Sequence, residues 1–334
     1  RIALKGAAER AASLGAHDQA VTFLEQALTV TTDPREEAEL LERAGALAST
    51  AGHHSAAERY LRRAIDIHVA RGDRVSAARA TAALGASLLV AYRVESALGL
   101  LEPAIEEFAD LGADPARVAV GGQLARGYFL HEEFRRAVET VDKVLVDAEH
   151  ADLVPVVADA LITRGCALWM LGQGYEGIGV IQAGERLAGV FGLTMTAYRG
   201  FLNRTEGEAH GDPRAGLAAA RTGLDDARRL GYRTWAVNLL GFTAMPCALR
   251  TGEWDWALAE LDTWLADESE GSQRAILLGW TVALRASRAE DVDAGRRELD
   301  ELTREETDRQ VLAVAAASRG FVALAAGDVD GAWR

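Results

Sequence analysis

The sequence is poor in cysteine, which limits what can hold the protein together. Its 334 residues include two cysteines, Cys166 and Cys247, each beside apolar residues. Two isolated cysteines form neither a disulfide framework nor a metal site, so we expect both to be reduced and buried. No apolar run approaches the length of a membrane span, and no signal-peptide pattern is present. We therefore expect a cytoplasmic protein that binds no membrane.

Positive charge is also scarce. Lysine and arginine together number 36 against 50 aspartates and glutamates, which gives a net charge of −14. An acidic chain repels phosphate backbones, and the sequence has no run rich in lysine or arginine. We expect no direct binding of nucleic acid by this segment.

Aromatic residues make up 6% of a chain that is 49% hydrophobic, and alanine is very common. Small side chains at this density favour closely packed helices over sheets, because alanine has the best helix propensity and loses no side-chain entropy. The composition is also too apolar for a disordered chain. It predicts an all-α protein with a substantial core.

The most regular feature is a repeat of about forty residues. The stretch "GEWDWALAEL" (252–261) aligns with "GAHDQAVTFL" (15–24) and "GHHSAAERYL" (52–61). Each has a glycine, a small residue five positions later and an apolar residue four positions after that. We call these small residues the anchors, and successive anchors are 37 to 41 residues apart. The anchors are Ala20, Ala57, Ala97, Ala137, Gly177, Gly216, Ala257, Gly295 and Ala332. This period is typical of solenoids built from helix pairs.

Each unit predicts two amphipathic helices joined by a turn. The first helix has a small residue near its middle, such as Gly45, Gly85 or Gly165, and the glycine that follows ends it. In the second helix apolar residues follow the anchor at helical spacing. Four prolines fall in the links and turns: Pro34, Pro115, Pro155 and Pro213. The other two, Pro103 and Pro246, lie within predicted helices, where we expect local kinks.

This pattern resembles the tetratricopeptide repeat (TPR). The resemblance covers almost the whole chain and rests on the turn glycines, the anchors and the glycines within the first helices. It implies an α-solenoid of about nine TPR-like helix-turn-helix repeats that form a right-handed superhelix, as a single array over 1–334. The units are longer than the usual 34 residues.

Stretched units of this kind look like the TPR regions of large bacterial signalling proteins. In those proteins an ATPase module is linked to the array and to a LuxR-type DNA-binding module or a nucleotide cyclase. The stretch 7–28 is similar to the first repeat after such an ATPase module. The chain also begins without methionine and ends in mid-pattern at 332–334, so we interpret it as part of a longer polypeptide with a truncated last repeat.

One motif suggests nucleotide binding but fits the repeat better. "GQGYEG" (172–177) matches G-x-G-x-x-G, whose mechanism needs a preceding strand so that the pyrophosphate meets a helix N-terminus. Here the preceding stretch 161–171 has a helical pattern, and the glycines fall on repeat positions. We expect no nucleotide cofactor.

Metal and catalytic motifs are equally incomplete. "HEEF" (131–134) lacks the second histidine of a zinc helix, and adjacent His53 and His54 have no further ligand nearby in sequence. The acidic stretches 290–295 and 327–331 lack the closing glutamate of a calcium loop. No nucleophile elbow and no cysteine–histidine pair is present. We expect no metal, no cofactor and no catalytic residue.

The resemblance also implies a ligand site, because stacked helix pairs form a concave face lined by their first helices. In the N-terminal units the residues expected there are small or polar: Glu39, Glu42, Ala46 and Ser49. From the fourth unit onward they become bulky. The predicted groove comprises Arg126, Phe129, Trp169, Met170, Tyr198, Phe201, Arg204, Leu239, Phe242 and Trp280, with Cys166 beside it. Five polar residues in or near it would orient an acidic or amide-bearing partner: Arg126, Arg199, Asn203, Arg204 and Arg250. Alternatively, many of these side chains only fill gaps between helices.

The sequence leaves two functions open. The first is a non-enzymatic scaffold that binds a protein, a peptide or a small-molecule inducer as the sensor or interaction region of a larger signalling or transcriptional regulator. The second is a structural spacer, or a self-association scaffold such as a homodimer, without ligand. The paired tryptophans Trp254 and Trp256 do not decide between them, because they occupy a turn and a helix start, where Trp256 is expected to pack against a neighbouring helix.

Overall fold

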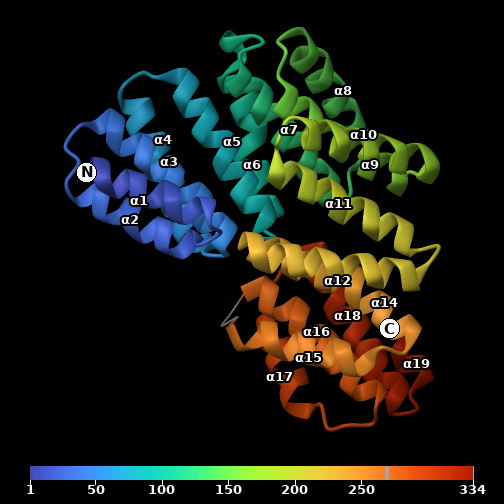
Figure 1. Cartoon of the computed structure of the whole chain (residues 1–334). Helices are drawn as coiled ribbons and strands as arrows, with labels where there is room; N and C mark the ends of the chain where they lie inside the picture. The colour runs from blue at the N-terminus through green and yellow to red at the C-terminus, as the bar shows by residue number, and fades with distance from the viewer. Residues whose placement is uncertain (268–270, 334) are drawn as a thin grey trace. The chain divides into compact units, whose positions relative to one another are not determined.

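The computed structural model describes residues 1–267 and 271–333, and every regular element in this part of the chain is a helix (Figure 1). The first helices of the pairs are α1 Ile2–Ser13, α3 Pro34–Ala51, α5 Arg74–Val90, α7 Pro115–Leu130, α9 Val154–Met170, α11 Thr194–Ala209, the run α13 Arg233–Leu239, η2 Leu240–Ala244 and α14 Met245–Thr251, then α16 Gly271–Ser287 and α18 Arg309–Ala325. The second helices are α2 His17–Thr29, α4 His54–Ala70, α6 Val94–Glu107, α8 Phe134–His150, α10 Gly174–Val190, α12 Pro213–Leu230, α15 Trp254–Asp267, α17 Asp293–Leu302 and α19 Val329–Ala332. A short 3-10 helix, η1 Ala109–Leu111, follows α6. The all-α prediction is confirmed.

The anchors occupy equivalent places in successive hairpins. Each is the fourth residue of its second helix in α2, α4, α6, α8, α10, α12, α15 and α19, and the third residue in α17. The small residues of the first helices allow the two helices of a pair to approach closely. A Cβ added to Gly45 would lie 2.6 Å from Leu61 Cγ, and one added to Gly85 would lie 2.7 Å from Leu101 Cδ2. The predicted hairpin register is therefore confirmed.

Helix boundaries follow from turn and capping chemistry. Gly52 and Gly252 have positive φ angles of 90° and 81°, which end α3 and α14 in the left-handed conformation that glycine adopts without steric cost. Asp33 and Asp73 cap α3 and α5, where their carboxylates accept hydrogen bonds from backbone N–H groups of the first turn. Pro34 follows as the first residue of α3, a position where its missing N–H costs nothing.

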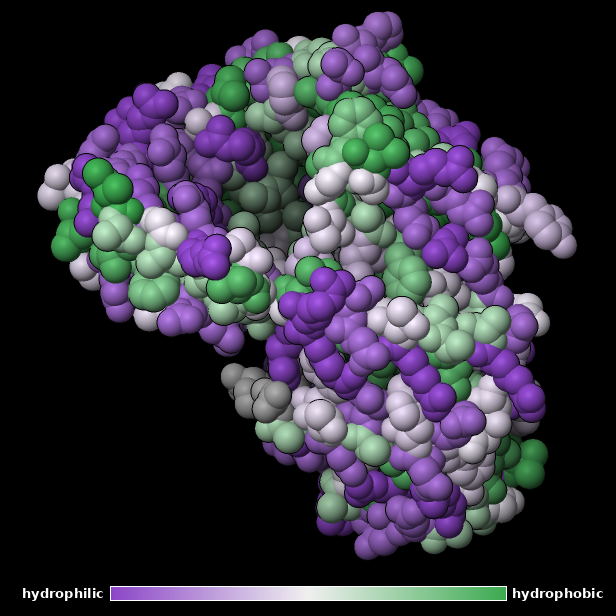
Figure 2. Space-filling model, viewed as in Figure 1, coloured by the Kyte–Doolittle hydropathy of each residue, from purple (hydrophilic) through white to green (hydrophobic). Residues whose placement is uncertain are grey.

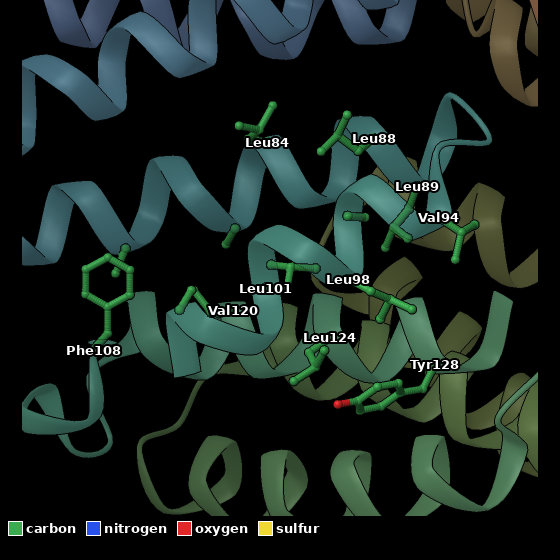
Figure 3. Packing of buried hydrophobic residues seen from close by; sticks show 14 of the residues in the cluster. Leu84, Leu88, Leu89, Val94, Leu98, Leu101, Phe108, Val120, Leu124 and Tyr128 are labelled. Atoms are coloured by element: carbon green, nitrogen blue, oxygen red, sulfur yellow. The ribbon is translucent and has the colours of Figure 1, made fainter. Parts of the chain in front are cut away.

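The chain divides into two compact units. Unit 1 comprises residues 1–207 and 227–234, and unit 2 comprises residues 208–226 and 235–334. One core cluster of unit 1 comprises Leu84, Leu88, Leu101, Val120 and other residues of α5, α6 and α7 (Figure 3). The single array over 1–334 stays a prediction.

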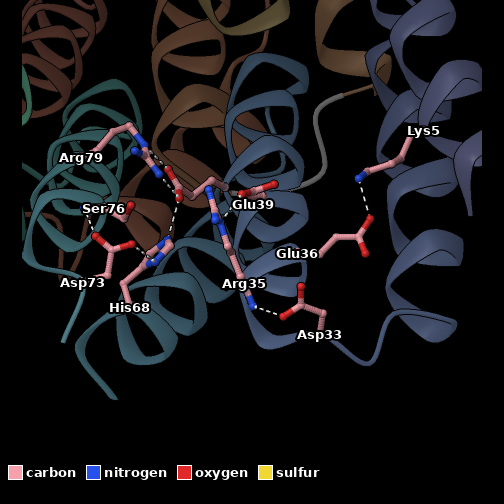
Figure 4. Close-up of polar contacts among 10 residues, drawn as sticks. Lys5, Asp33, Arg35, Glu36, Glu39, His68, Asp73, Ser76 and Arg79 are labelled. Carbon is pink, nitrogen blue, oxygen red and sulfur yellow. Dashed lines mark hydrogen bonds and ion pairs between the residues drawn. The ribbon is translucent and has the colours of Figure 1, made fainter. Parts of the chain in front are cut away.

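Polar side chains link successive hairpins of unit 1. Glu42 on α3 accepts hydrogen bonds from Arg79 on α5 through both carboxylate oxygens, each at 2.9 Å, and lies 2.8 Å from Nε2 of the buried His68 (Figure 4). Lys5 similarly reaches Glu36 at 2.6 Å.

Arg43 on α3 also links two hairpins, because it reaches across to Glu9 on α1. Glu39, one helical turn before Arg43, pairs instead with Arg35. The hairpin of α1 and α2 offers Arg43 an acidic partner that the local sequence pattern did not reveal.

Two prolines were expected to kink helices. Pro103 lies inside α6 of unit 1, and Pro246, in unit 2, is the second residue of α14, which directly follows η2, a π-helical turn of five residues. Proline lacks the N–H that an uninterrupted α-helix would use at this position, and the π turn accommodates that loss. Trp256 packs under Arg221 of α12, whose guanidinium carbon lies 4.4 Å from the ring centroid, so the prediction for this tryptophan is confirmed. Both cysteines are free and buried, as expected.

Candidate binding surface on the first helices

The predicted groove residues fall into two sets, because the chain forms two units. Arg126, Phe129, Trp169, Met170, Tyr198, Phe201 and Arg204 belong to unit 1, whereas Leu239, Phe242 and Trp280 belong to unit 2.

In unit 2 two of the three residues are enclosed. Leu239 is fully buried and Trp280 is 8% exposed, whereas Phe242 is half-buried. The reason is that Gly241 lets α16 approach η2 so closely that an added Cβ would lie 2.5 Å from Ile276 Cγ2. Leu239 therefore belongs to the core, which corrects its placement on an open surface.

The unit 1 set lies on three successive first helices. Arg126 and Phe129 come from α7, Trp169 and Met170 from α9, and the remaining three residues from α11. Met170 is 53% exposed, Tyr198 is buried at 7%, and the others are half-buried. In the view of Figure 2, the surface of this unit is hollowed beside α5 and α6. We call the accessible part of the set, formed by α7, α9 and α11, the inner surface.

Glycines make room for the largest aromatic side chain of the inner surface. A Cβ on Gly174 would lie 3.2 Å from the Trp169 ring, and one on Gly207 would lie 3.6 Å from it. The indole therefore packs between the start of α10 and the end of α11 while part of it stays accessible. Trp169 is held in place before any ligand arrives.

A buried ion pair joins α9 to α11 beneath this surface. The Arg199 guanidinium donates hydrogen bonds to the Asp159 carboxylate at 2.7 Å, to the Asp159 carbonyl oxygen at 3.0 Å and to the Thr163 hydroxyl at 2.8 Å. The Asn203 amide donates to the Arg199 carbonyl oxygen at 2.8 Å and accepts from the Cys166 thiol at 3.2 Å. These contacts fix the relative register of the two helices.

Burial shifts the ionisation of the groups around this network. The pKa of Arg126 is lowered to about 9, first by desolvation and then by the positive charge of Arg199. Desolvation raises the pKa of Glu206 to about 7, and it raises the pKa of the Cys166 thiol to about 12. The inner surface thus holds charged groups in a poorly hydrated setting, where electrostatic interactions with a ligand are strong. It also keeps Cys166 protonated, which makes the thiol unreactive.

Besides Arg199, two further arginines expected to orient a partner are already paired. Arg204 forms an ion pair with Glu185 at 2.7 Å and lies 5.7 Å from the centroid of the Phe201 ring. Arg250, in unit 2, donates to the carbonyl oxygens of Ala209 and His210, each at 3.4 Å.

Asp159 and Thr163 on α9 and Glu206 on α11 are polar residues whose roles the sequence reasoning missed. For Asp159, the sequence does contain a signal that could have revealed its partner. Asp159 and Arg199 are 40 residues apart, which equals the spacing of several anchors, so they occupy matching positions on neighbouring first helices. Glu42 and Arg79, which also form an ion pair, are 37 residues apart, and this separation is another of the anchor spacings. Opposite charges one repeat apart therefore predict pairs between repeats.

The ionisation of Glu206 predicts a pH dependence of stability. Its pKa in the folded chain, about 7, is raised above the ordinary value of 4.5, so the folded state binds the proton more tightly. The stability that Glu206 contributes is then highest at a pH below its ordinary pKa, and it falls as the pH rises towards the pKa of the folded chain. We expect the urea midpoint to be lower at about pH 8 than at about pH 5, and Glu206→Gln to reduce this difference. The exposed Glu139→Gln is the control, and equal pH dependence of the two variants would contradict the assignment.

The motif "GQGYEG" has a packing role in this structure. Helix α9 precedes it, as expected, rather than a strand, and Gly174 opens α10. A Cβ added to Gly165 would lie 2.6 Å from the Gly177 carbonyl oxygen, and one added to Gly177 would lie 2.6 Å from the Gly165 carbonyl oxygen. Within residues 1–267 and 271–333, no cluster of three metal-ligating side chains is found, and no helix has the length and hydropathy that crossing a bilayer requires.

These features define a helix-hairpin repeat array of the TPR type. No family model matches the sequence, and no curated protein matches it closely enough to serve as a relative. Among solved structures, the chain is similar to a Rap protein complexed with Competence and Sporulation Factor, with a TM-score of 0.55 and 11% identity over 99% of this chain and 98% of that one.

Further similar structures include a STAND ATPase with a tetratricopeptide repeat sensor from Pyrococcus horikoshii, with a TM-score of 0.48 and 13% identity over 90% of this chain and 53% of that one. Another is a tetratricopeptide repeat protein from Parabacteroides merdae, with a TM-score of 0.47 and 13% identity over 85% of this chain and 99% of that one. At these identities the likeness concerns the fold. The chain has a TPR-like α-solenoid fold, as the sequence pattern predicts.

Proposed function

We propose that the chain is a non-enzymatic scaffold that binds a peptide or an extended protein segment on the inner surface of unit 1. The observation that carries this proposal is the gathering of half-buried aromatic and charged side chains on three successive first helices, α7, α9 and α11. Aromatic side chains and arginine dominate binding energy at interfaces. The similar Rap protein is complexed with Competence and Sporulation Factor, which agrees with a ligand-binding role for such a fold.

The chemistry of the surface favours a ligand with apolar and acidic or amide groups in alternation. Phe129, Trp169 and Phe201 supply apolar contact area, and Arg126 supplies positive charge within an acidic chain. An anionic group placed near Arg126 would be attracted strongly because that site is poorly hydrated. We infer that such binding makes the chain the sensor or interaction region of a larger signalling or transcriptional regulator, with a small-molecule inducer as a further candidate ligand.

Trp169→Ala and Phe201→Ala test this proposal. A peptide library displayed on phage is selected against the purified chain, and the recovered peptides are titrated by calorimetry. We expect each variant to weaken binding by about tenfold or more, which corresponds to about 1.4 kcal/mol and is ordinary for an aromatic anchor.

Tyr175→Ala provides the matched control for this titration. Tyr175 is an aromatic residue on α10 that is 99% exposed and lies outside the inner surface, so its loss should leave affinity unchanged. Unchanged affinity in the Trp169 and Phe201 variants, with intact helical content, would remove the inner surface from consideration.

The alternative is a spacer or self-association scaffold without ligand. A spacer has no need for accessible aromatic side chains, and the half-buried Phe129, Trp169 and Phe201 favour the binding role. Sedimentation velocity over a range of protein concentrations distinguishes the ligand-binding scaffold from the self-association scaffold. A concentration-dependent dimer that Trp169→Ala abolishes would support self-association through this surface.

A further inference from the structure

Two segments of unit 1 that are far apart in sequence meet directly. The turn between α1 and α2, residues 15–17, lies against residues 230–234 at the end of α12 and the start of α13. The His17 Nε2 donates a hydrogen bond to the Leu230 carbonyl oxygen at 3.0 Å, across 213 residues of sequence. Nearby, the Thr234 hydroxyl lies 3.4 Å from the Ser49 carbonyl oxygen at the end of α3.

This contact brings backbone against backbone, which only glycine allows. A Cβ on Gly231 would lie 2.2 Å from the Gly15 carbonyl oxygen, a separation that real atoms never show. A Cβ on Gly15 would lie 3.0 Å from the Leu230 carbonyl carbon. Both glycines also have positive φ angles, 68° and 75°. The turn geometry and the close approach therefore depend on the same two residues.

A row of aromatic rings leads from this contact to the inner surface. The His17 ring stacks on the Tyr232 ring with a centroid distance of 6.3 Å and an interplanar angle of 11°. Tyr232 meets Tyr198 edge-on at 5.7 Å, and Tyr198 lies 6.0 Å from Phe201. Tyr198 and Tyr232 are both nearly buried, so moving one ring requires its neighbours to move.

Such a contact is unusual for a repeat array, in which each hairpin normally touches only its sequence neighbours. Here the first hairpin touches a segment that follows the sixth second helix, α12. A closing contact between distant hairpins restricts changes in curvature, which are the softest motions of a solenoid. The same segment, residues 230–234, leads directly into Trp235, where the chain passes into unit 2.

We propose that residues 15–17 and 230–234 form a clasp that fixes the curvature of unit 1 and responds to events at Tyr198 and Phe201. A change at these rings is passed through Tyr232 to the N-terminal hairpin and to the connection that leads into unit 2. The clasp itself stands on its geometry alone. Its use as a response to ligand rests on the proposed function.

Gly231→Ala in the full chain tests the clasp, with Gly192→Ala as a closely matched control. Gly192 ends α10 as Gly231 ends α12 and has the same φ of 68°, but an added Cβ there meets nothing within 4 Å. Both variants carry the same local backbone strain, and only Gly231→Ala separates the clasp. Hydrogen exchange of the amides at 15–20 should be about tenfold faster in Gly231→Ala than in Gly192→Ala. Equal rates in the two variants would overturn the clasp.

The coupling to the inner surface is tested without a ligand. Tyr198→Ala should accelerate exchange at 15–20, whereas Tyr198→Phe, which keeps the ring, should not. Phe129→Ala removes an aromatic residue outside the row and should also leave these rates unchanged. Acceleration by Phe129→Ala equal to that by Tyr198→Ala, or none by Tyr198→Ala, would overturn the coupling.

The outcomes of this test and of the binding test are separate. If Gly231→Ala accelerates exchange while Trp169→Ala leaves peptide affinity unchanged, the clasp stands and the proposed binding role fails. If Gly231→Ala and Gly192→Ala exchange at equal rates while Trp169→Ala lowers peptide affinity, the inner surface binds ligand and the clasp is disproved.

Discussion

Replacing Gly177 with alanine is expected to destabilise unit 1 by about 2–3 kcal/mol, the range for overpacking a core that cannot relax. The added Cβ would lie 2.6 Å from the Gly165 carbonyl oxygen and 2.9 Å from the Trp169 backbone nitrogen. Both are backbone atoms, so no side-chain rotation can relieve the overlap, and α9 and α10 must move apart. The measurement is the shift of the urea unfolding midpoint, followed by circular dichroism.

Gly179→Ala on the same helix is the control for this prediction. Nothing lies within 4 Å of a Cβ at Gly179, and the residue is exposed. Alanine is favoured over glycine in a helix interior by about 0.5–1 kcal/mol, so this variant should be slightly more stable than the parent chain. Midpoints that shift in the same direction for both variants would show that packing against Gly165 does not explain the role of Gly177.

The hairpin array could be predicted from the sequence because its cause is local and repeated. Each anchor must be small where two helices touch, so alanine or glycine recurs at every interval of 37 to 41 residues. Turn glycines and capping residues mark the helix ends by the same logic. Nine repetitions of one pattern outweigh the ambiguity of any single copy.

The features that the sequence did not reveal depend on contacts between distant residues. The division into two units falls near residue 207, in a stretch whose repeat pattern resembles the others. The clasp joins Gly15 to Gly231, and each of these glycines, taken alone, is explained by its own turn. The π-helical turn at η2 leaves no mark in the spacing of apolar residues beyond the presence of Pro246.

The inner surface was predictable only in part. The helical face of α7, α9 and α11 follows from the repeat register, and Arg126, Phe129 and Trp169 on this face are half-buried. Leu239 has the same register, yet it is buried because Gly241 brings α16 close to η2. Exposure depends on how far neighbouring helices separate, and register alone does not determine that distance.

Replacing Arg199 with alanine is the second change expected to have a large effect. It removes hydrogen bonds to the Asp159 carboxylate, the Asp159 carbonyl oxygen and the Thr163 hydroxyl. The side chain of Arg199 is almost entirely buried, and the Asp159 carboxylate would remain without this partner in a poorly hydrated place. We expect a loss of about 2–4 kcal/mol, at the lower part of the range for breaking a buried pair, because Asp159 keeps some contact with solvent.

Arg199→Lys and Arg204→Ala make this expectation specific. Lysine keeps the charge but its compact ammonium group cannot span the same three acceptors, so a loss between those of the parent and Arg199→Ala is expected. Arg204, on the same helix, pairs with Glu185 at a more accessible site, and its removal should cost less than about 1 kcal/mol. If Arg204→Ala proved as damaging as Arg199→Ala in urea unfolding, the Arg199–Asp159 pair would have no special part in holding α11 against α9. Because that pair joins α9 to α11, two of the helices that carry the inner surface, its loss should also weaken peptide binding, even under conditions in which the variant remains folded.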